Sequence, residues 1–489
     1  MLRQWKINWN IALNNDSPVY KQIEKNIIIE ISKGRLASGT PMPGSRELAS
    51  HLKVNRNTVA KAYEQLVVKG WLQVKGKRGT FVADPLPVAI TTNGNGHTKE
   101  QKAAFSFNIF GVEQLPFTIT ETNWQVRFDD GFPDPHLAPI QELNSTYKRI
   151  FNWKMRQKKM EFQNSNVYRP MQELFTNMLN QSRGFSLNSD SVVFIMGQQI
   201  TMYMVARVLL KKGDAVVMGS PGNALAQHIF ESCYAEVLPC ATDEEGLDTE
   251  QLETICKGRK IKAVYLSPQG EYPTTATLSA SRSAHLLKLA NQHNFAVIES
   301  DYDHEYWYGE QPFIPLAAND TDGRVIYISA VSKMLPPFFL MGVVAGPPDF
   351  IRSLRILQGM IGQQGDIVLE TAVEELIHEG TIPRYARKSI NLYREKRDNA
   401  GSVLDNYLHR YATFTKPQSG LAYWIKFKED TDIQKLLMQL QQKGIFIPNP
   451  NTLIYSDTTL PAIRIGFGSI DLRELEQGTK AIAEILKAQ

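Results

Sequence analysis

The chain has 489 residues, with 54 Lys and Arg against 50 Asp and Glu and only three cysteines. This length leaves room for a small module beside one large domain with a sizeable core. Polar residues interrupt any apolar core near the start and no apolar run could span a bilayer, so we expect a cytoplasmic protein without a membrane partner. The cysteines lack the paired spacing of a metal site, so we expect reduced packing residues and no metal. They are Cys233, Cys240 and Cys256.

The basic residues are concentrated at the N-terminal end. Residues 1–84 contain 14 Lys and Arg and 6 Asp and Glu, an excess of eight positive charges, whereas the whole chain has an excess of four. The remaining 405 residues therefore carry four more negative charges than positive ones. Attraction to phosphate groups would use a basic excess confined to a short module, so this pattern favours a nucleic-acid partner.

Residues 43–83 begin with two predicted helices joined by a tight turn. Ser45 is placed to N-cap the first helix, and Asn55, after the turn at Lys53 and Val54, is placed to cap the second. Apolar side chains recur at helical spacing on one face of each helix. They are Leu48, Ala49 and Leu52 in the first helix and Val59, Ala62, Tyr63, Leu66 and Val67 in the second.

A short basic hairpin follows these helices. The stretches 71–74 and 80–82 alternate as strands around the Gly-flanked basic loop 75–79. Helix, turn, helix and wing in this order predict a winged helix-turn-helix domain over residues 1–84, whose second helix reads the major groove of double-stranded DNA. An amphipathic helical hairpin with solvated charges would explain either helix alone, but not the whole set.

Residues 17–83 resemble a GntR-type winged-helix domain. The resemblance rests on the stretches SPVYKQI, LASGTPMPGSRELA, NRNTVAKAYEQL and GKRGTFV, in that order. One departure is Gly44, which stands where the family usually has a serine. The DNA contacts that the resemblance implies are Arg46, Arg56, Asn57, Thr58, Lys77 and Arg78.

Residues 85–104 separate this domain from the rest of the chain. They are rich in Pro, Gly and small polar residues and show no hydrophobic periodicity. This composition predicts a flexible linker with a reach on the order of tens of ångströms. The alternative is a surface loop.

Residues 105–489 alternate short apolar runs with helical patterns such as Ala280–His293. Each run is almost continuously apolar, as expected of strands that are buried on both faces. The runs are Val192–Met196, Ala215–Met218, Ala263–Leu266, Phe295–Ile298, Val325–Ile328 and Val343–Ala345. The alternation predicts an α/β domain with a mostly parallel sheet, in which ligands bind at the carboxyl ends of the strands.

Three of these strand ends carry candidate site residues. Gly197 and Gln198 form a strand-to-helix turn whose N–H groups could bind an anion, although Gly is common in such turns. The acidic stretch 299–305 includes Tyr302. Lys333 follows the fifth run and could form a Schiff base with an aldehyde; the alternative is a lysine that extends to the surface.

From about residue 165 onward the sequence resembles a fold-type I, class I aminotransferase-like domain, and nearly the whole chain resembles the MocR group of GntR regulators. The stretches that match are LLKKGDAVVMGSPG, DEEGLDTEQL, IKAVYLSP, YPT, ESDYDHEYWY, GRVIYISAVSK and IRIGFG. The resemblance implies a C-terminal subdomain at about 385–489. It also implies that Arg464 binds the carboxylate of a substrate or effector, for which a guanidinium is suited.

The resemblance further implies a site for pyridoxal 5′-phosphate. Lys333 would be the Schiff-base lysine, and Tyr302 would hydrogen-bond the 3′-oxygen of the pyridine ring. The residues implied at the phosphate group are Ser332, Gly197 and Gln198.

Several positions depart from the family pattern. Ser300 stands where a carboxylate would protonate the pyridine nitrogen, and a serine cannot stabilise a pyridinium as an ion pair does. Leu340 replaces an arginine at the phosphate. The other departures are Asn223 for tyrosine, Glu271 for glutamine or asparagine, and a shortened loop at 168–170. Together they indicate a pocket that has been released from pyridoxal-phosphate chemistry or holds the cofactor weakly, unless a neighbouring acid such as Asp301 or Asp303, or a distant cation, takes over.

We therefore expect a homodimeric transcriptional regulator whose non-catalytic aminotransferase-like domain senses a small molecule. An amino compound sensed through pyridoxal phosphate is one form of this hypothesis. Two alternatives stay open. One is an active pyridoxal-phosphate-dependent aminotransferase with an accessory DNA module, and the other is a regulator whose cofactor-free pocket binds another ligand or serves only for dimerisation.

Overall fold

The computed structural model describes residues 17–84, 86, 124–156, 169–333, 335, 341–363, 365–456 and 460–488. The chain divides into two compact units, Met1–Ile109 and Phe110–Gln489, each with hydrophobic cores of its own. Most of the predicted linker 85–104 lies outside the described residues, as do Tyr168 and Leu340.

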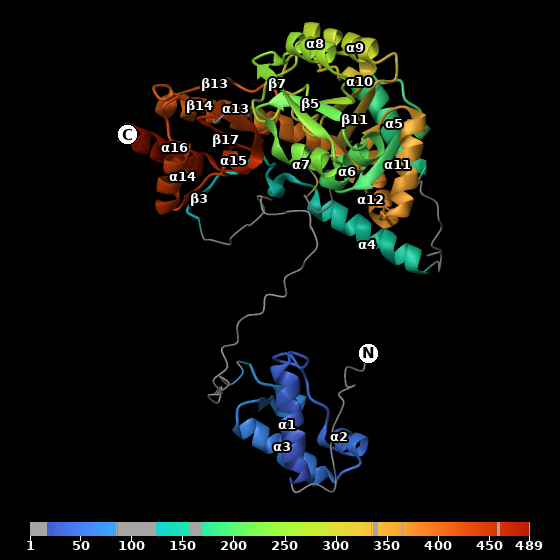
Figure 1. Ribbon diagram of the computed structural model, residues 1–489, viewed down its shortest axis with the longest axis vertical. Coiled ribbons are helices and arrows are strands. Elements are labelled where there is room, and N and C mark those ends of the chain that lie inside the picture. The colour runs from blue at the N-terminus through green and yellow to red at the C-terminus, as the bar shows by residue number, and fades with distance from the viewer. Residues whose placement is uncertain are drawn as a thin grey trace. The chain divides into compact units, whose positions relative to one another are not determined.

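The first unit is a three-helix domain with a two-stranded antiparallel hairpin (Figure 1). Its helices are α1 (Val19–Ser32), α2 (Ser45–Leu52) and α3 (Arg56–Val68), and its strands are β1 (Leu72–Val74) and β2 (Thr80–Val82). The apolar faces predicted for α2 and α3 pack against Ile23 and Ile27 of α1, which are fully buried. The predicted helix-turn-helix and wing are therefore confirmed.

The two predicted helix caps had different outcomes. Asn55 caps α3 as predicted, because its side chain accepts a hydrogen bond of 2.9 Å from the N–H of Asn57. The prediction for Ser45 is wrong. The N–H of Leu48 bonds to the carbonyl of Gly44, so Gly44 is the cap residue and Ser45 is already inside the helix.

The second unit is built around an eight-stranded mixed sheet with the order β4-β12-β11-β10-β9-β5-β7-β8. The strands are β4 (Val192–Met196), β5 (Ala215–Ser220), β7 (Glu236–Asp243), β8 (Gly246–Leu247), β9 (Ala263–Leu266), β10 (Ala296–Ser300), β11 (Val325–Ala330) and β12 (Met341–Ala345). Only β12 and β8 run antiparallel to their neighbours. The predicted mostly parallel sheet is confirmed.

Helices cover both faces of this sheet, which is why its central strands are mostly apolar. One face packs on α6 (Gln198–Leu209), α7 (Ala224–Ser232) and α11 (Pro348–Met360). The other packs on α4 (Ile140–Arg156), α5 (Arg169–Arg183), α8 (Thr249–Gly258), α9 (Ala280–His293) and α12 (Ile367–His378). Successive side chains of β11 show the alternation, since Ile326 and Ile328 face the first group of helices and Tyr327 the second.

A smaller subdomain contains the three-stranded antiparallel sheet β13-β14-β17. Its elements are α13 (Thr381–Leu408), β13 (Ala412–Phe414), β14 (Ala422–Phe427), α14 (Ile433–Gln442), β15 (Ile445–Phe446), β17 (Ala462–Gly466) and α16 (Leu472–Lys487). The early strand β3 (Val126–Arg127) pairs with β15, and Phe128 is fully buried in the same core. A segment near residue 126 therefore joins the C-terminal part of the chain, as Figure 1 shows beside α14. Within the described ranges, no helix is both long and apolar enough to span a bilayer.

Candidate functional site

The N-terminal end of α3 presents the polar residues that the sequence predicts at DNA. Arg56 and Asn57 are exposed in the first turn of the helix, and Thr58 is partly exposed. The side chain of Asn55 accepts a hydrogen bond from the N–H of Asn57, and its backbone carbonyl accepts one from the N–H of Thr58 at 3.0 Å. Arg side chains and free N–H groups at a helix N-terminus are suited to base edges and to phosphate oxygens.

Three arginines on this unit are exposed and have no carboxylate partner among the described residues. They are Arg46 at the start of α2, Arg56 at the start of α3, and Arg78 in the wing between β1 and β2. The side chain of Lys77, also predicted at DNA, lies outside the described part of the chain. The ion pairs of this unit involve other cations, Arg35 with Glu30 and Lys69 with Glu24.

Lys333 lies just beyond the carboxyl end of β11, as predicted. Its ammonium pairs with the carboxylate of Asp303, and its Nζ lies 3.5 Å from the carbonyl oxygen of Gly131. Its side chain is 21% exposed. Lys333 is thus held by partners at the sheet edge and does not extend into solvent, contrary to the alternative considered from the sequence.

Arg464 of β17 contacts Asp130, the residue before the Gly131 that Lys333 contacts. Its Nε donates a 3.2 Å hydrogen bond to the backbone oxygen of Asp130 and lies 3.2 Å from the carboxylate of the same residue, with which it forms an ion pair. Its Nη1 donates to the carbonyl of Pro273 at 2.8 Å. The guanidinium carbon lies 4.9 Å from the ring centroid of Tyr272. Burial raises the pKa of Asp130, while the neighbouring Arg464 opposes that rise. The fold therefore brings Lys333 and Arg464 together around adjacent residues.

Tyr302 and the Gly197–Gln198 turn are also brought together. The hydroxyl of Tyr302 lies 3.5 Å from the carbonyl oxygen of Gln198, at the start of α6. Gly197 has φ +93°, a conformation that favours glycine, and no side chain caps this helix. Ser332, the other predicted phosphate ligand, donates a 2.7 Å hydrogen bond to Glu305, and the N–H of Lys333 donates to the same carboxylate.

The acidic residues next to Ser300 face the other side of the sheet. Ser300 hydrogen-bonds Tyr265 on the face that packs on α6. Asp301 accepts a 2.8 Å hydrogen bond from Tyr327 and forms a buried ion pair with Arg183. Asp301 is therefore engaged elsewhere and does not replace the missing carboxylate.

Two further departures have structural roles here. Asn223 caps α7 by accepting a hydrogen bond from the N–H of Ala226 at 3.1 Å. Glu271 is buried and accepts a hydrogen bond from the N–H of Ser267 at 3.0 Å. Burial raises the pKa of Glu271 to about 7. A carboxyl group that is partly protonated near neutrality can stand where glutamine or asparagine is usual, because both forms accept this hydrogen bond.

The described residues fit only part of pyridoxal phosphate. Lys333 supplies an amine for the aldehyde, and Tyr302 supplies a hydroxyl at the Gln198 turn. No described carboxylate shares a hydrogen bond with Ser300, and the hydroxyl of Ser332 is bonded to Glu305. The set does not fit a pyridinium electron sink, which requires an acid at the ring nitrogen.

The sequence did not single out some residues that complete this region. Asp130 and Gly131 lie 334 and 202 residues from their partners Arg464 and Lys333. Arg183 lies 118 residues from Asp301. Tyr272 was marked only as part of the YPT stretch. Local pattern carries no signal for such pairs, since the fold alone brings them together.

The chain is similar over nearly its whole length to proteins named as transcriptional regulators. Residues 19–82 match the family model of bacterial regulatory proteins of the gntR family. The probable rhizopine catabolism regulatory protein MocR of Rhizobium meliloti is 25% identical over 477 residues, covering 96% of this chain and 93% of that protein. The uncharacterized HTH-type transcriptional regulator YisV of Bacillus subtilis is 23% identical, covering 97% of each chain.

The second unit has a known enzyme fold. A crystal structure of Pyrococcus horikoshii kynurenine aminotransferase matches with a TM-score of 0.71 and 24% identity, covering 79% of this chain and 96% of that one. At this identity the match shows the fold, which is the fold-type I aminotransferase fold.

Proposed function

We propose that this chain, which carries a GntR-type helix-turn-helix domain and is homologous over its full length to MocR-type regulators, is a DNA-binding transcriptional regulator whose aminotransferase-like unit senses a small molecule. One observation carries the DNA-binding part. Arg46 at the start of α2, Arg56 at the start of α3 and Arg78 in the wing are exposed and have no carboxylate partner among the described residues.

Substitution of Arg56 tests the DNA-binding part. The full-length protein would be titrated by fluorescence anisotropy against duplexes from its own upstream region. Arg56→Gln should weaken binding about ten-fold, because it removes a contact to a base or phosphate. The matched control is Lys33→Gln, which removes the same charge from an exposed residue after α1. Equal losses in both variants would mean general attraction of the basic unit to DNA and would contradict recognition by α3.

Lys333 and Arg464 support the sensing part of the proposal. Both side chains contact residues 130–131. A guanidinium is suited to carboxylates and a lysine amine to aldehydes, so this neighbourhood supports a site for both groups. The effector class that suits this pair is a small carboxylate that also carries an amino or aldehyde group. Binding there would favour one arrangement of the protein over another and so change how DNA is held.

An absorbance spectrum before and after addition of pyridoxal phosphate tests how Lys333 is used. If the cofactor is used for sensing, borohydride should fix it to Lys333, and Lys333→Ala should abolish both the attachment and the response to the effector. We expect no turnover of an amino donor, because Ser300 stands at the position where the family has a carboxylate and no described carboxylate hydrogen-bonds it. Sustained transamination would instead favour an active aminotransferase. A response that survives Lys333→Ala would favour a cofactor-free pocket.

A further inference from the structure

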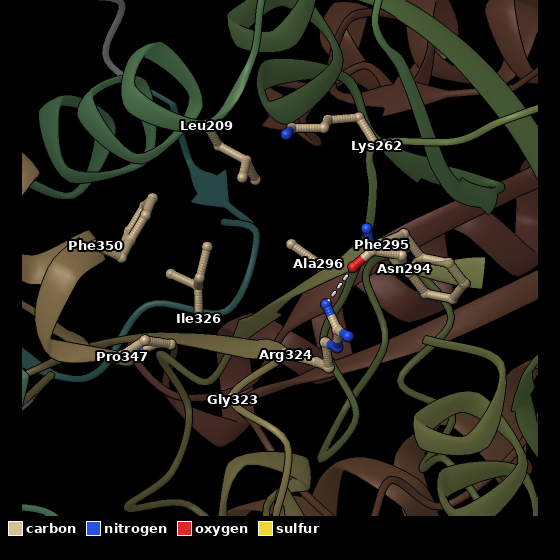
Figure 2. A pocket seen from close by; sticks show the side chains of 10 residues that line it. All are labelled: Leu209, Lys262, Asn294, Phe295, Ala296, Gly323, Arg324, Ile326, Pro347 and Phe350. Atoms are coloured by element: carbon tan, nitrogen blue, oxygen red, sulfur yellow. Dashed lines mark hydrogen bonds between the residues drawn. The ribbon is translucent and has the colours of Figure 1, made fainter. Parts of the chain in front are cut away.

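A pocket lies at the amino ends of the strands of the large sheet, whereas Lys333 lies beyond their carboxyl ends. It has a volume of about 230 Å³ and lies at the amino ends of β9, β10 and β11 (Figure 2). Lys262 and Arg324 line it, and each immediately precedes a strand, β9 or β11. The five residues of β10 separate this edge from Ser300 by about 15 Å.

Six of the ten residues that line this pocket are apolar. Ala296 and Ile326 come from the sheet, Leu209 from the end of α6, and Phe350 from the first turn of α11. Figure 2 shows these side chains around one space, with the Lys262 side chain extending toward Leu209. An apolar space with a few polar groups at its rim is the usual construction of a small-molecule site.

The charges at the rim are all positive. None of the described residues that line the pocket is acidic. Arg324 donates hydrogen bonds to the side-chain oxygens of Asn291 and Asn294, which fix its position without neutralising its charge. Lys262 forms no ion pair with any described residue. The nearby carboxylate of Asp320 accepts hydrogen bonds from the N–H groups of Asp322 and Val325.

We propose that this pocket binds a small organic monocarboxylate with an apolar body, such as one aromatic ring or a branched chain. The carboxylate would lie between Lys262 and Arg324, and the apolar body would contact Ile326 and Phe350. The volume is below the usual range for larger ligands, which limits the occupant to about one ring. This site is separate from the one at Lys333 and Arg464, and it does not depend on the proposed regulatory function.

Calorimetric titration of the full-length protein with phenylacetate tests the proposal. Phenylacetamide is the neutral probe of the same shape, and it should bind at least five-fold more weakly because it lacks the charge. Lys262→Gln should weaken phenylacetate binding about three- to five-fold, and Ala296→Leu should abolish it by filling the space. Lys260→Gln is the matched control, because Lys260 is an exposed lysine two residues away that does not line the pocket.

Arg464→Gln distinguishes the two sites, since Arg464 could also bind a carboxylate. Phenylacetate affinity should be unchanged in this variant. The proposal is overturned if Arg464→Gln removes the binding while Lys262→Gln does not, or if Lys262→Gln and Lys260→Gln behave alike. Equal affinity for phenylacetate and phenylacetamide would also overturn it. The comparison of the two lysine variants remains decisive even if Ala296→Leu fails to fold.

Discussion

At the end of β10, the direction of each side chain decides whether a neighbouring carboxylate can replace the one that the family has at the position of Ser300. Successive residues of a strand face opposite sides of the sheet. Glu299 and Asp301 both face away from Ser300, and Glu299 is bonded to the N–H groups of Leu316 and Ala317. Burial, with the neighbouring Asp301, raises the pKa of Glu299 to about 8. The acidic stretch therefore contains carboxylates, but not on the face where Ser300 departs from the family.

The ion pair between Asp301 and Arg183 should be important for stability. The two side chains are 2% and 9% exposed, so removing the carboxylate leaves a buried guanidinium without its partner. Asp301→Asn should lower the free energy of unfolding by about 3 kcal/mol. In an Arg183→Met background the same change should cost much less, because no buried charge is then left. Urea denaturation of the four proteins measures both losses, and equal losses in the two backgrounds would contradict the coupling.

Glu271 should make stability depend on pH. Its pKa is about 7 in the folded protein against 4.5 for the unperturbed group, so the folded state holds the proton more tightly. The protonated form stabilises the fold fully below about pH 4.5, and this contribution is lost as pH rises through 7. Glu271→Gln should leave stability at pH 5 nearly unchanged and raise it at pH 8 by about 2–3 kcal/mol relative to the parent.

Thermal unfolding at the two pH values measures this difference. Glu310→Gln is the matched control, because Glu310 is exposed and should show no such gain. A gain of equal size at pH 5 and pH 8 would mean that Glu271 does not titrate as inferred.

At the scale of elements, burial on both faces made most of the large sheet predictable. All six apolar runs became strands of that sheet, although β5, β10 and β11 end later than predicted and β12 begins earlier. Strand β7, which lies between β5 and the short edge strand β8, was missed because only one of its side chains is fully buried, so it lacks a continuous apolar run. The two-residue β3 was missed because such a short strand has no periodicity and forms only by pairing with β15.

Individual site residues could be predicted from the sequence, but the residues that they contact could not. Lys333, Tyr302 and the Gly197–Gln198 turn could be named because each follows a recognisable strand. Which groups hold Lys333 could not be inferred, because Gly131 precedes it by 202 residues. The ion pair between Asp301 and Arg183 could not be predicted from the sequence either, because it depends on how α5 packs against the sheet.

The contact between α16 and the segment before α4 should tolerate no extra volume. Gly478 lies in α16, and a Cβ added there would lie 2.4 Å from the ring of Phe128, which is fully buried. Gly478→Ala should lower stability by about 1–2 kcal/mol, because overpacking outweighs the higher helix propensity of alanine. Gly258→Ala is the control, since an added Cβ at the end of α8 meets nothing within 4 Å. Thermal unfolding compares the two, and equal effects would contradict the overpacking.

At the scale of the whole molecule, exposed apolar side chains on the second unit suggest where two copies meet. Large apolar side chains are usually buried, so several exposed ones on neighbouring elements indicate an interface. On the second unit such side chains occur in α11 and just after its end, at the start of α12, and on α4, which packs against α12. They are Ile356, Met360, Ile361, Ile367, Ile140, Phe151 and Trp153. A homodimer formed there would place two DNA-binding units in one assembly, which is the arrangement that paired half-sites require.

Ile356→Glu should therefore separate the copies. Ile356 is 55% exposed, so a charge there is harmless to a single chain but costly once it is covered by a partner. Light scattering during size-exclusion chromatography should show the mass of one chain for this variant and of two for the parent. The control is Met438→Glu on α14, where an apolar side chain of 57% exposure stands apart from this group.

DNA binding extends the same test to function. On a duplex with both half-sites, a dimer binds with both of its DNA-binding domains and gains avidity. The monomeric Ile356→Glu variant should therefore bind this duplex about 10²-fold more weakly. On a duplex cut down to one half-site, the two proteins should bind alike, because α3 and the wing are untouched by the change. A variant that stays dimeric would place the interface elsewhere on the second unit. If the variant is a monomer but keeps full affinity for the longer duplex, each DNA-binding domain binds DNA independently of the other.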